Sequence, residues 1–152
     1  MNKWMKLAHD EALAGMQNNE GGPFGAAIVR GDELVCVTHN QVLATNDPTA
    51  HAEVNAIRQA SRILGSYDLS DCVLYTTCYP CPMCLGAILW ARIPTVYYGA
   101  TGADAAKGGF DDERFHTFIR NPGNAFNLAP LDMEKTRELF NRWLEKSDRI
   151  LY

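Results

Sequence analysis

The sequence has no long apolar run and no surplus of positive charge. No stretch reaches the roughly 18 apolar residues that a membrane-spanning helix needs. Residues 1–17 carry charges along their length and lack the apolar core of a signal peptide. The 14 Lys and Arg residues are outnumbered by 18 Asp and Glu, which gives a net charge of −4. We therefore expect a soluble cytoplasmic protein that does not bind a membrane. We also expect no nucleic-acid partner, because a protein that binds phosphates usually has a basic surface.

The cysteine content excludes a second class of protein. Five cysteines are an odd number in a chain of 152 residues, and this argues against a secreted disulfide scaffold and for reduced thiols or a metal site. The length and the 47% hydrophobic content suit one domain with a proper core. We expect a single domain over residues 1–152.

The apolar pattern predicts alternating helices and strands. The expected helices cover residues 2–17, 50–64, 82–93 and 130–146, and the expected strands cover residues 26–29, 34–37, 72–78 and 95–100. This alternation predicts an α/β sandwich with parallel pairing after the opening hairpin. Residues 101–129 are rich in Gly, Asp and Asn and show little periodicity, which is typical of a functional or mobile loop.

Two cysteines at CxxC spacing, Cys81 and Cys84, lie in the segment YPCPMC. Taken alone, this spacing fits a redox pair, half of a zinc ribbon, or chance. Pro82 is compatible with the first turn of a helix, where its missing N–H is not needed. The two thiols would then lie at a helix N-terminus, whose partial positive charge favours thiolates.

The segment HAE at residues 51–53 supplies the deciding context. His51 with Cys81 and Cys84 makes three zinc ligands, which leaves a fourth position open for water. Glu53 lies two residues after the proposed ligand His51 and can reach that water. HxE followed by PCxxC is the signature of zinc-dependent base deaminases, and Pro80 completes it here.

The predicted mechanism is a hydrolytic deamination. Zinc lowers the pKa of its water, so that hydroxide is present near neutral pH and attacks an sp² carbon bearing an exocyclic amine. Glu53 takes the water proton, delivers it to a ring nitrogen and later helps to protonate the departing ammonia.

The remaining cysteines and histidines have less specific interpretations. Cys36 and Cys72 lie within apolar strand runs and are expected to be small buried hydrophobic residues. Cys78 precedes Cys81 by three residues, so a ligand or redox role stays open. His39 and His116 either line the pocket or serve the structure.

Four segments together resemble the bacterial guanine deaminases of the cytidine deaminase superfamily: GGPFGA at 21–26, NDPTAHAEV at 46–54, PCPMCLGAI at 80–88 and GFDD at 109–112. The resemblance implies one zinc ion per subunit and conversion of the free nucleobase guanine to xanthine plus ammonia. It also implies a three-layer α/β/α sandwich around a mixed five-stranded sheet. Finally, it implies a homodimer whose C-terminal segment, about 130–152, can be swapped between subunits.

The same resemblance implies roles in substrate binding. Asn40 would hydrogen-bond the base, Phe24 would stack on it, and Asp112 would bind its polar edge. Tyr152 would close the pocket of the neighbouring subunit. The full set of expected substrate-binding residues is Phe24, Asn40, Ala52, Tyr79, Asp112 and Tyr152.

Simpler roles stay open for several of these residues. Phe24 fits a core residue after a glycine turn, and Asn40 fits a turn residue at a strand end. Asp111 and Asp112 fit a loop that faces water. A tyrosine at the end of a chain is ordinarily frayed, so the role of Tyr152 depends on the resemblance.

Position 79 departs from the family pattern. The family usually reads CEPCPMC, whereas this chain reads CYPCPMC, so Tyr79 replaces a glutamate beside the zinc ligands. A neutral phenol that can donate replaces an anionic acceptor, which leaves the metal site intact but changes which ring suits the pocket. The alternative substrates are another aminated heterocycle such as a pterin, an aminotriazine, isocytosine or cytosine.

Two other functions compete with this prediction. A tRNA adenosine deaminase shares HAE and PCxxC, but it would need a basic surface to bind phosphates. A non-enzymatic zinc module would need a fourth protein ligand, for which Cys78 is the candidate.

Overall fold

The structure, a computed structural model, describes residues 1–110 and 112–152. Within these residues the chain divides into two compact units, residues 1–115 and 116–152. The first unit is built on one sheet of four strands in the order β2-β1-β3-β4. The strands are β1 (Gly25–Arg30), β2 (Glu33–His39), β3 (Cys72–Cys78) and β4 (Thr95–Ala100). β1 runs antiparallel to both β2 and β3, and β3 runs parallel to β4, so the sheet is mixed.

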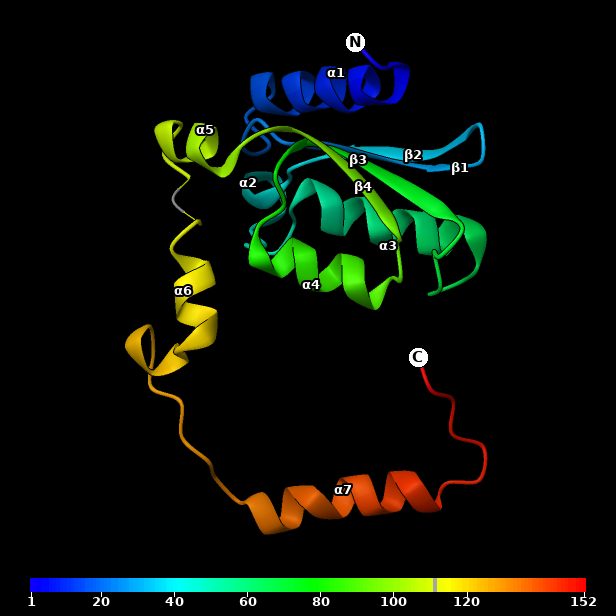
Figure 1. The fold of residues 1–152 in the computed structure, drawn as a ribbon, viewed down its shortest axis with the longest axis vertical. Coiled ribbons are helices and arrows are strands. Elements are labelled where there is room, and N and C mark those ends of the chain that lie inside the picture. The colour runs from blue at the N-terminus through cyan, green and yellow to red at the C-terminus, as the bar shows by residue number, and fades with distance from the viewer. Residues whose placement is uncertain (111) are drawn as a thin grey trace. The chain divides into compact units, whose positions relative to one another are not determined.

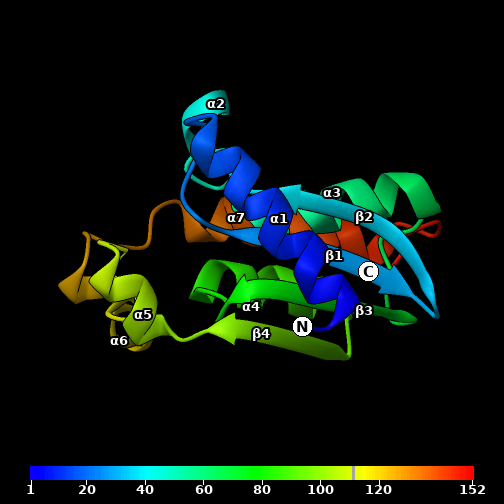
Figure 2. The ribbon, with the colours of Figure 1, turned by 90° about the horizontal axis from the view of Figure 1, so that it is seen from above.

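Helices cover both faces of this sheet (Figure 1). α1 (Lys3–Gln17) packs against β1, β2 and β3 on one face, and the view from above shows it lying across the strands (Figure 2). α3 (Ala52–Leu64) packs on the opposite face and contacts α4 (Pro82–Trp90), while the short α2 (Val42–Thr45) follows β2. The three-layer α/β/α sandwich predicted from the sequence is therefore confirmed.

The main core lies between the sheet and the layer of α3. In β3 every second residue, from Cys72 to Cys78, is buried, as the two-residue period of a strand requires. On α3 the buried side chains Ala52, Ala56 and Ala60 repeat every four residues, so one narrow face of the helix lies close to the strands. Small residues there let α3 bring its first turn against β3, next to the site described below.

The ends of two helices follow the local chemistry of the sequence. α3 ends at Leu64, and its C-cap residue Gly65 adopts the left-handed conformation that favours glycine. α4 begins at Pro82, with Cys81 as its N-cap residue. α4 stops at Trp90, short of the predicted residue 93, because Arg92 takes a positive φ of 62° and Pro94 follows.

Two predictions for the second half of the chain were wrong. The sheet has four strands rather than five, because the described residues after Ala100 form only helices, turns and irregular segments. Residues 101–129, expected to be a loop, contain α5 (Gly102–Lys107), α6 (Phe115–Arg120) and the 3₁₀ helix η1 (Pro122–Asn124). α5 starts at a capping box in which Thr101 and Asp104 bond each other's backbone N–H groups.

The second unit, residues 116–152, contains α7 (Met133–Glu145), which confirms the predicted C-terminal helix.

Across residues 1–110 and 112–152, no helix combines the length and the apolar character that crossing a membrane would require.

Candidate active site

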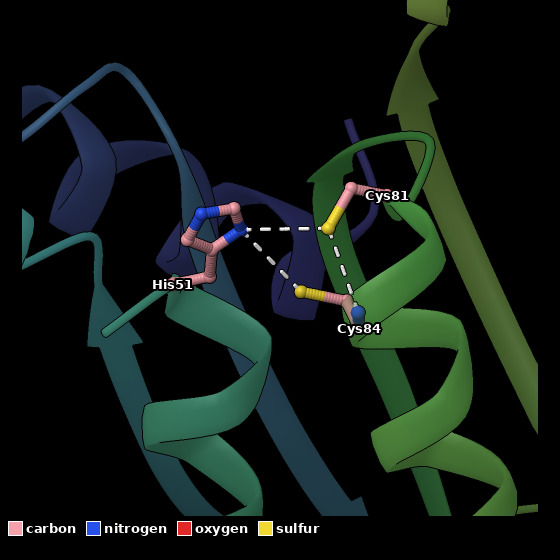
Figure 3. Close-up of side chains that lie close together, drawn as sticks. All are labelled: His51, Cys81 and Cys84. Carbon is pink, nitrogen blue, oxygen red and sulfur yellow. Dashed lines mark hydrogen bonds between the residues drawn. The ribbon is translucent and has the colours of Figure 1, made fainter. Parts of the chain in front are cut away.

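Three side chains that could bind a metal ion converge at the start of two helices (Figure 3). His51 is the N-cap residue of α3, and Cys81 and Cys84 lie at the N-terminus of α4. The Nδ1 atom of His51 lies 3.6 Å from the sulfur of Cys81 and 3.6 Å from the sulfur of Cys84. Because α3 and α4 pack side by side on one face of the sheet, their first turns bring the three ligands together.

The donor set and its spacing fit zinc. An imidazole and two thiolates are typical zinc ligands, and tetrahedral Zn–N and Zn–S bonds place the nitrogen and sulfur atoms about 3.6 Å apart. The observed separations of 3.6 Å match this value. Among the described residues, no fourth side chain joins the group. Cys78, the alternative ligand, instead points its sulfur at the carbonyl oxygen of Thr101, 3.6 Å away.

The site favours ionised sulfur. A hydrogen bond from the Cys84 thiol lowers the pKa of Cys81 to about 4, and hydrogen bonding with His51 acts in the same direction. The pKa of Cys84 is raised because its proton is shared with Cys81 and because its thiol is buried. The hydrogen bond with Cys81 also raises the pKa of His51. One thiolate is therefore already present near neutral pH, and metal binding would displace the second thiol proton.

Glu53 lies beside this cluster, in the first turn of α3. Its Oε1 atom accepts a hydrogen bond of 2.8 Å from the Thr76 hydroxyl, and its Oε2 atom lies 3.4 Å from the sulfur of Cys84. The side chain is only 5% exposed, and this burial raises the pKa of the carboxyl group. A carboxyl group that is fixed in place and holds its proton more firmly than usual is suited to passing protons beside a metal.

A cavity of about 550 Å³ opens beside His51. This volume is within the range typical of small-molecule sites. The residues that line it include Phe24, Asn40, His51, Phe110, Asp112 and Arg114. The structure thus brings three of the expected substrate-binding residues, Phe24, Asn40 and Asp112, to the same cavity as the metal ligand His51.

The wall of the cavity next to Asn40 is built by the loop that precedes β1. The Oδ1 atom of the buried Asn40 accepts hydrogen bonds from the backbone N–H groups of Gly22 (3.3 Å) and Val42 (3.2 Å). Its oxygen is therefore committed, and the group it can offer a ligand is its NH₂ donor. A Cβ atom at Gly21 would lie 2.1 Å from that oxygen, so only glycine fits there.

Aromatic rings form another wall of the cavity. The rings of Phe24 and Phe110 meet edge to face with their centroids 4.8 Å apart. A Cβ atom at Gly22 would come within 2.8 Å of both rings, so the absence of a side chain leaves room for them. A planar heterocycle suits such a wall.

The remaining expected substrate-binding residues are Ala52, Tyr79 and Tyr152. Ala52 is fully buried between His51 and Glu53. The Tyr79 ring is 42% exposed, meets the Tyr98 ring edge to face at 5.1 Å, and is not among the residues that line the cavity. Tyr152 belongs to the second unit, and Asp111 is outside the described residues.

The structure also shows where the cysteines and histidines lie whose roles the sequence left open. Cys36 and Cys72 are buried, as expected, and all five cysteines are free thiols. His39 does not line the cavity but lies between two glutamates. His116 is exposed in the second unit.

Sequence reasoning missed several residues at this site. Thr76, which orients Glu53, was not named, although its place in the alternating pattern of CVLYTTC turns it toward α3. Phe110 lies in the segment GFDD, from which Asp112 was predicted to bind substrate, so the same segment could have indicated Phe110. Arg114, also on the cavity wall, has no such signal, because nothing in its neighbourhood is periodic.

Comparison with known proteins agrees with this geometry. The cytidine and deoxycytidylate deaminase zinc-binding region matches residues 1–100. Guanine deaminase of Bacillus subtilis (strain 168) is 46% identical over 151 residues, covering 98% of this chain and 97% of its own. A crystal structure of guanine deaminase from Bacillus subtilis has a TM-score of 0.90, with 43% identity over 100% of this chain and 99% of the other.

Other relatives are more distant. The tRNA-specific adenosine deaminase of Buchnera aphidicola subsp. Schizaphis graminum is 38% identical over 118 residues, covering 78% of each chain. A structure of guanine deaminase from Nitrosomonas europaea has a TM-score of 0.68, with 31% identity over 72% of this chain and 63% of the other.

These matches confirm the resemblance predicted from the four sequence segments, and with it the zinc cofactor that His51, Cys81 and Cys84 are positioned to bind. The chain belongs to the zinc-binding cytidine and deoxycytidylate deaminase family and is a zinc-dependent aminohydrolase.

Proposed function

We propose that this protein hydrolyses guanine to xanthine and ammonia. The observation that carries the proposal is the placement of the buried Glu53 carboxyl group, 3.4 Å from Cys84, beside a zinc-binding cluster that shares a cavity with Phe24, Asn40 and Asp112. The 46% identity to a guanine deaminase over nearly the whole chain supports guanine as the base.

The chemistry divides between the metal and the protein. A zinc ion held by His51, Cys81 and Cys84 would act as a Lewis acid and make water nucleophilic near neutral pH. Glu53 would take one proton from the attacking water and pass it to the ring nitrogen next to the attacked carbon. It would then move the proton of the new hydroxyl group to the amino group, so that the C–N bond breaks, ammonia leaves and the carbonyl of xanthine forms. The hydrogen bond from Thr76 keeps the carboxyl group in one orientation during these transfers.

The cavity offers complementary partners for a purine. The NH₂ group of Asn40 would donate to a carbonyl oxygen, and the carboxylate of Asp112 would accept from ring N–H groups. The ring of Phe24 would pack against the face of the base. Ala52 would contribute its backbone at the start of α3, where the N–H groups of the first turn have no partner within the helix.

Tyr79 favours a second candidate within the same reaction class. Because position 79 carries a phenol in place of the family's usual glutamate, a base that presents a carbonyl or a bare ring nitrogen there would bind better than one that presents N–H. The candidates are a pterin, an aminotriazine, isocytosine or cytosine. Deamination of tRNA is less favoured, because the chain has no basic surplus with which to bind phosphates.

A screen for ammonia release tests the substrate. Zinc-loaded protein would be given purines, pterins, pyrimidines and triazines in turn, with a chelator-treated sample as the control. Guanine should release ammonia fastest, and the chelator should abolish that release. Preference for another base would replace guanine with that base, while a lack of ammonia from every base would reject the deaminase.

The active protein would be a homodimer in which residues 130–152 cross to the partner and Tyr152 closes the partner's cavity. Supporting this, α7 exposes four large apolar side chains of the kind that subunit interfaces bury, namely Met133, Leu139, Phe140 and Leu144. A cytoplasmic location completes the proposal and fits five free thiols, which a reducing compartment would preserve.

Mixing two inactive variants tests the exchange. One variant carries Glu53→Gln and the other lacks Tyr152. In a swapped hybrid dimer, one site has both Glu53 and the partner's Tyr152, so activity should return after the two chains are unfolded and refolded together. Each variant refolded alone is the control. Failure of the mixture to recover activity would reject the swap, and light scattering would establish whether the protein is a dimer.

A further inference from the structure

His39, the last residue of β2, is held between two glutamates that lie far from it in the sequence. Its Nδ1 atom lies 2.7 Å from Oε1 of Glu11 on α1, and its Nε2 atom lies 2.6 Å from Oε2 of Glu20 in the loop after α1. The His39 side chain is only 14% exposed. The ring rests against α1 at Gly15, where a Cβ atom would lie 2.2 Å from its Cδ2 atom.

This geometry favours a charged ring. A neutral imidazole has one donor nitrogen and one acceptor nitrogen, so one of its nitrogens would face a carboxylate oxygen without a proton between them. With both nitrogens protonated, each donates to one carboxylate, and both contacts become short charge-assisted hydrogen bonds. The arrangement is therefore a glutamate–imidazolium–glutamate triad that ties β2 to α1 and to the loop that follows α1.

The triad borders the wall of the substrate cavity on two sides. Asn40 directly follows His39, and its carboxamide oxygen holds the backbone N–H groups of Gly22 and Val42. On the other side, the carbonyl oxygen of Glu20 accepts hydrogen bonds of 3.0 Å from the N–H groups of Leu43 and Ala44. The cavity lining is thus attached to His39 itself and to Glu20, one of the two glutamates that the imidazolium joins.

We propose that His39 is a positioning residue for substrate binding: its imidazolium, clamped between Glu11 and Glu20, holds the Asn40 wall of the cavity in the shape that binds the base. Loss of the proton weakens one side of the clamp and loosens this wall. Base affinity therefore falls as His39 loses its proton, while the metal cluster and Glu53, which His39 does not contact, are unaffected. The inference deepens the proposed function and rests on it for the identity of the base.

The charges around the ring support this role. Burial by itself would lower the pKa of His39, but the hydrogen bonds with Glu11 and Glu20 outweigh it and raise the pKa above its ordinary value. The same contact with His39 lowers the pKa of Glu20, to which Asn18 and Gln41 also donate. The charged groups that face the ring are Glu11 from α1 and Glu20 from the following loop. The raised pKa and the two carboxylate contacts thus both favour the imidazolium form of His39.

Steady-state kinetics across pH test the proposal on the zinc-loaded protein. In the wild type, KM for guanine should rise as pH passes the raised pKa of His39, without a matching change in kcat. His39→Gln should raise KM roughly tenfold at neutral pH, the loss expected for one charge-assisted hydrogen bond, and should abolish that pH-dependent rise. A KM profile that is the same in the wild type and in His39→Gln would overturn the proposal.

Two carboxamide variants separate positioning from a merely structural role. Glu11→Gln and Glu20→Gln each keep an acceptor oxygen but remove a charge, so each should move the midpoint of the KM rise to lower pH. A structural role alone would weaken folding without moving this midpoint. His9→Gln, at an exposed histidine on α1, is the matched control and should leave the profile unchanged. An unmoved midpoint in both glutamine variants would reject the clamp.

A measurement without substrate distinguishes failure of this inference from failure of the proposed function. In an NMR titration of the zinc-loaded protein, the backbone N–H signals of Gly22 and Val42 should change with the same midpoint as the His39 ring. If they do so while guanine is not deaminated, the proposed substrate is wrong and the clamp stands. If guanine is deaminated but these signals do not follow the ring, the clamp is wrong.

Discussion

The carboxyl group of Glu53, on α3, accepts a 2.8 Å hydrogen bond from the hydroxyl of Thr76, on β3. This contact joins the helix that carries the metal ligand His51 to the strand that leads to Cys81. One carboxyl oxygen is fixed by it, and the other lies 3.4 Å from the sulfur of Cys84. The group proposed to transfer protons is therefore oriented by the fold before any ligand binds.

Glu53→Gln should give a folded, zinc-loaded protein whose turnover is reduced at least about 100-fold, because the amide keeps the shape of the side chain but cannot carry the proton. Metal analysis and the melting temperature, measured beside kcat, establish that only chemistry is lost. Ordinary turnover in this variant would remove Glu53 from the mechanism.

Cys81→Ser and Cys78→Ser form a matched pair for the metal site. Cys81→Ser should lose zinc on dialysis, because it removes one of three ligands. Cys78→Ser should retain one zinc per chain, because the Cys78 sulfur faces the Thr101 carbonyl oxygen instead of the cluster. Metal content measured by atomic spectroscopy compares the two. Zinc loss from Cys78→Ser would indicate a closed structural site with four protein ligands.

Gly22→Ala should narrow the substrate cavity. Its new methyl group would come within 2.8 Å of the rings of Phe24 and Phe110, which must then shift. We expect KM to rise roughly 10- to 100-fold, since a misplacement near 1 Å can cost about 100-fold. Gly86→Ala is the control, because apart from its chain neighbours and the nearby backbone of α4 no atom lies within 4 Å of its new methyl group. That change should leave KM unaltered and stabilise α4 by about 1 kcal/mol.

Tyr79→Glu restores the carboxylate that the family usually carries beside the zinc ligands. We expect guanine turnover to increase relative to the other bases in the screen, because an anionic acceptor would again face the N–H groups of the base. Tyr98→Glu, which changes the ring that Tyr79 contacts, is the control. An unaltered substrate preference in Tyr79→Glu would show that position 79 lies beyond the reach of the base.

The His39 clamp predicts a pH dependence of stability. The pKa of His39 is raised by folding, so its contribution to the free energy of unfolding is fully present below its unfolded pKa of about 6.5. The contribution is lost as pH rises through the raised folded value. The free energy of unfolding of the wild type, measured with urea, should therefore decrease over this pH range relative to that of His39→Gln. Parallel stability curves for the two proteins would contradict the prediction.

The sequence predicted the parts of the fold that depend on local chemistry. β3 was placed at its observed bounds, Cys72–Cys78, because alternating burial leaves a clear two-residue pattern. The metal cluster was predicted because ligand type and CxxC spacing are set by the ion, and Pro82 marks the helix start that places both cysteines.

The features that the sequence did not predict depend on contacts between residues far apart in the chain, or on segments too short to show a pattern. The short helix α5 relies on one capping box and has no apolar period to reveal it. The fifth strand came from analogy alone, and nothing in the residues after Ala100 supports it. Glu11 and Glu20 are 28 and 19 residues from His39, so only the packing of α1 on the sheet brings the triad together.

His51 is the N-cap residue of α3, and Cys81 is the N-cap residue of α4. An ion shared between them joins two helices of one layer, so its binding free energy becomes part of the free energy of folding. At a free ion concentration about 100 times the dissociation constant, this linkage is worth about 2.7 kcal/mol. Zinc supply in the cell should therefore affect the lifetime of the protein as well as its activity. The zinc-free protein would unfold more often, and proteases would degrade it faster.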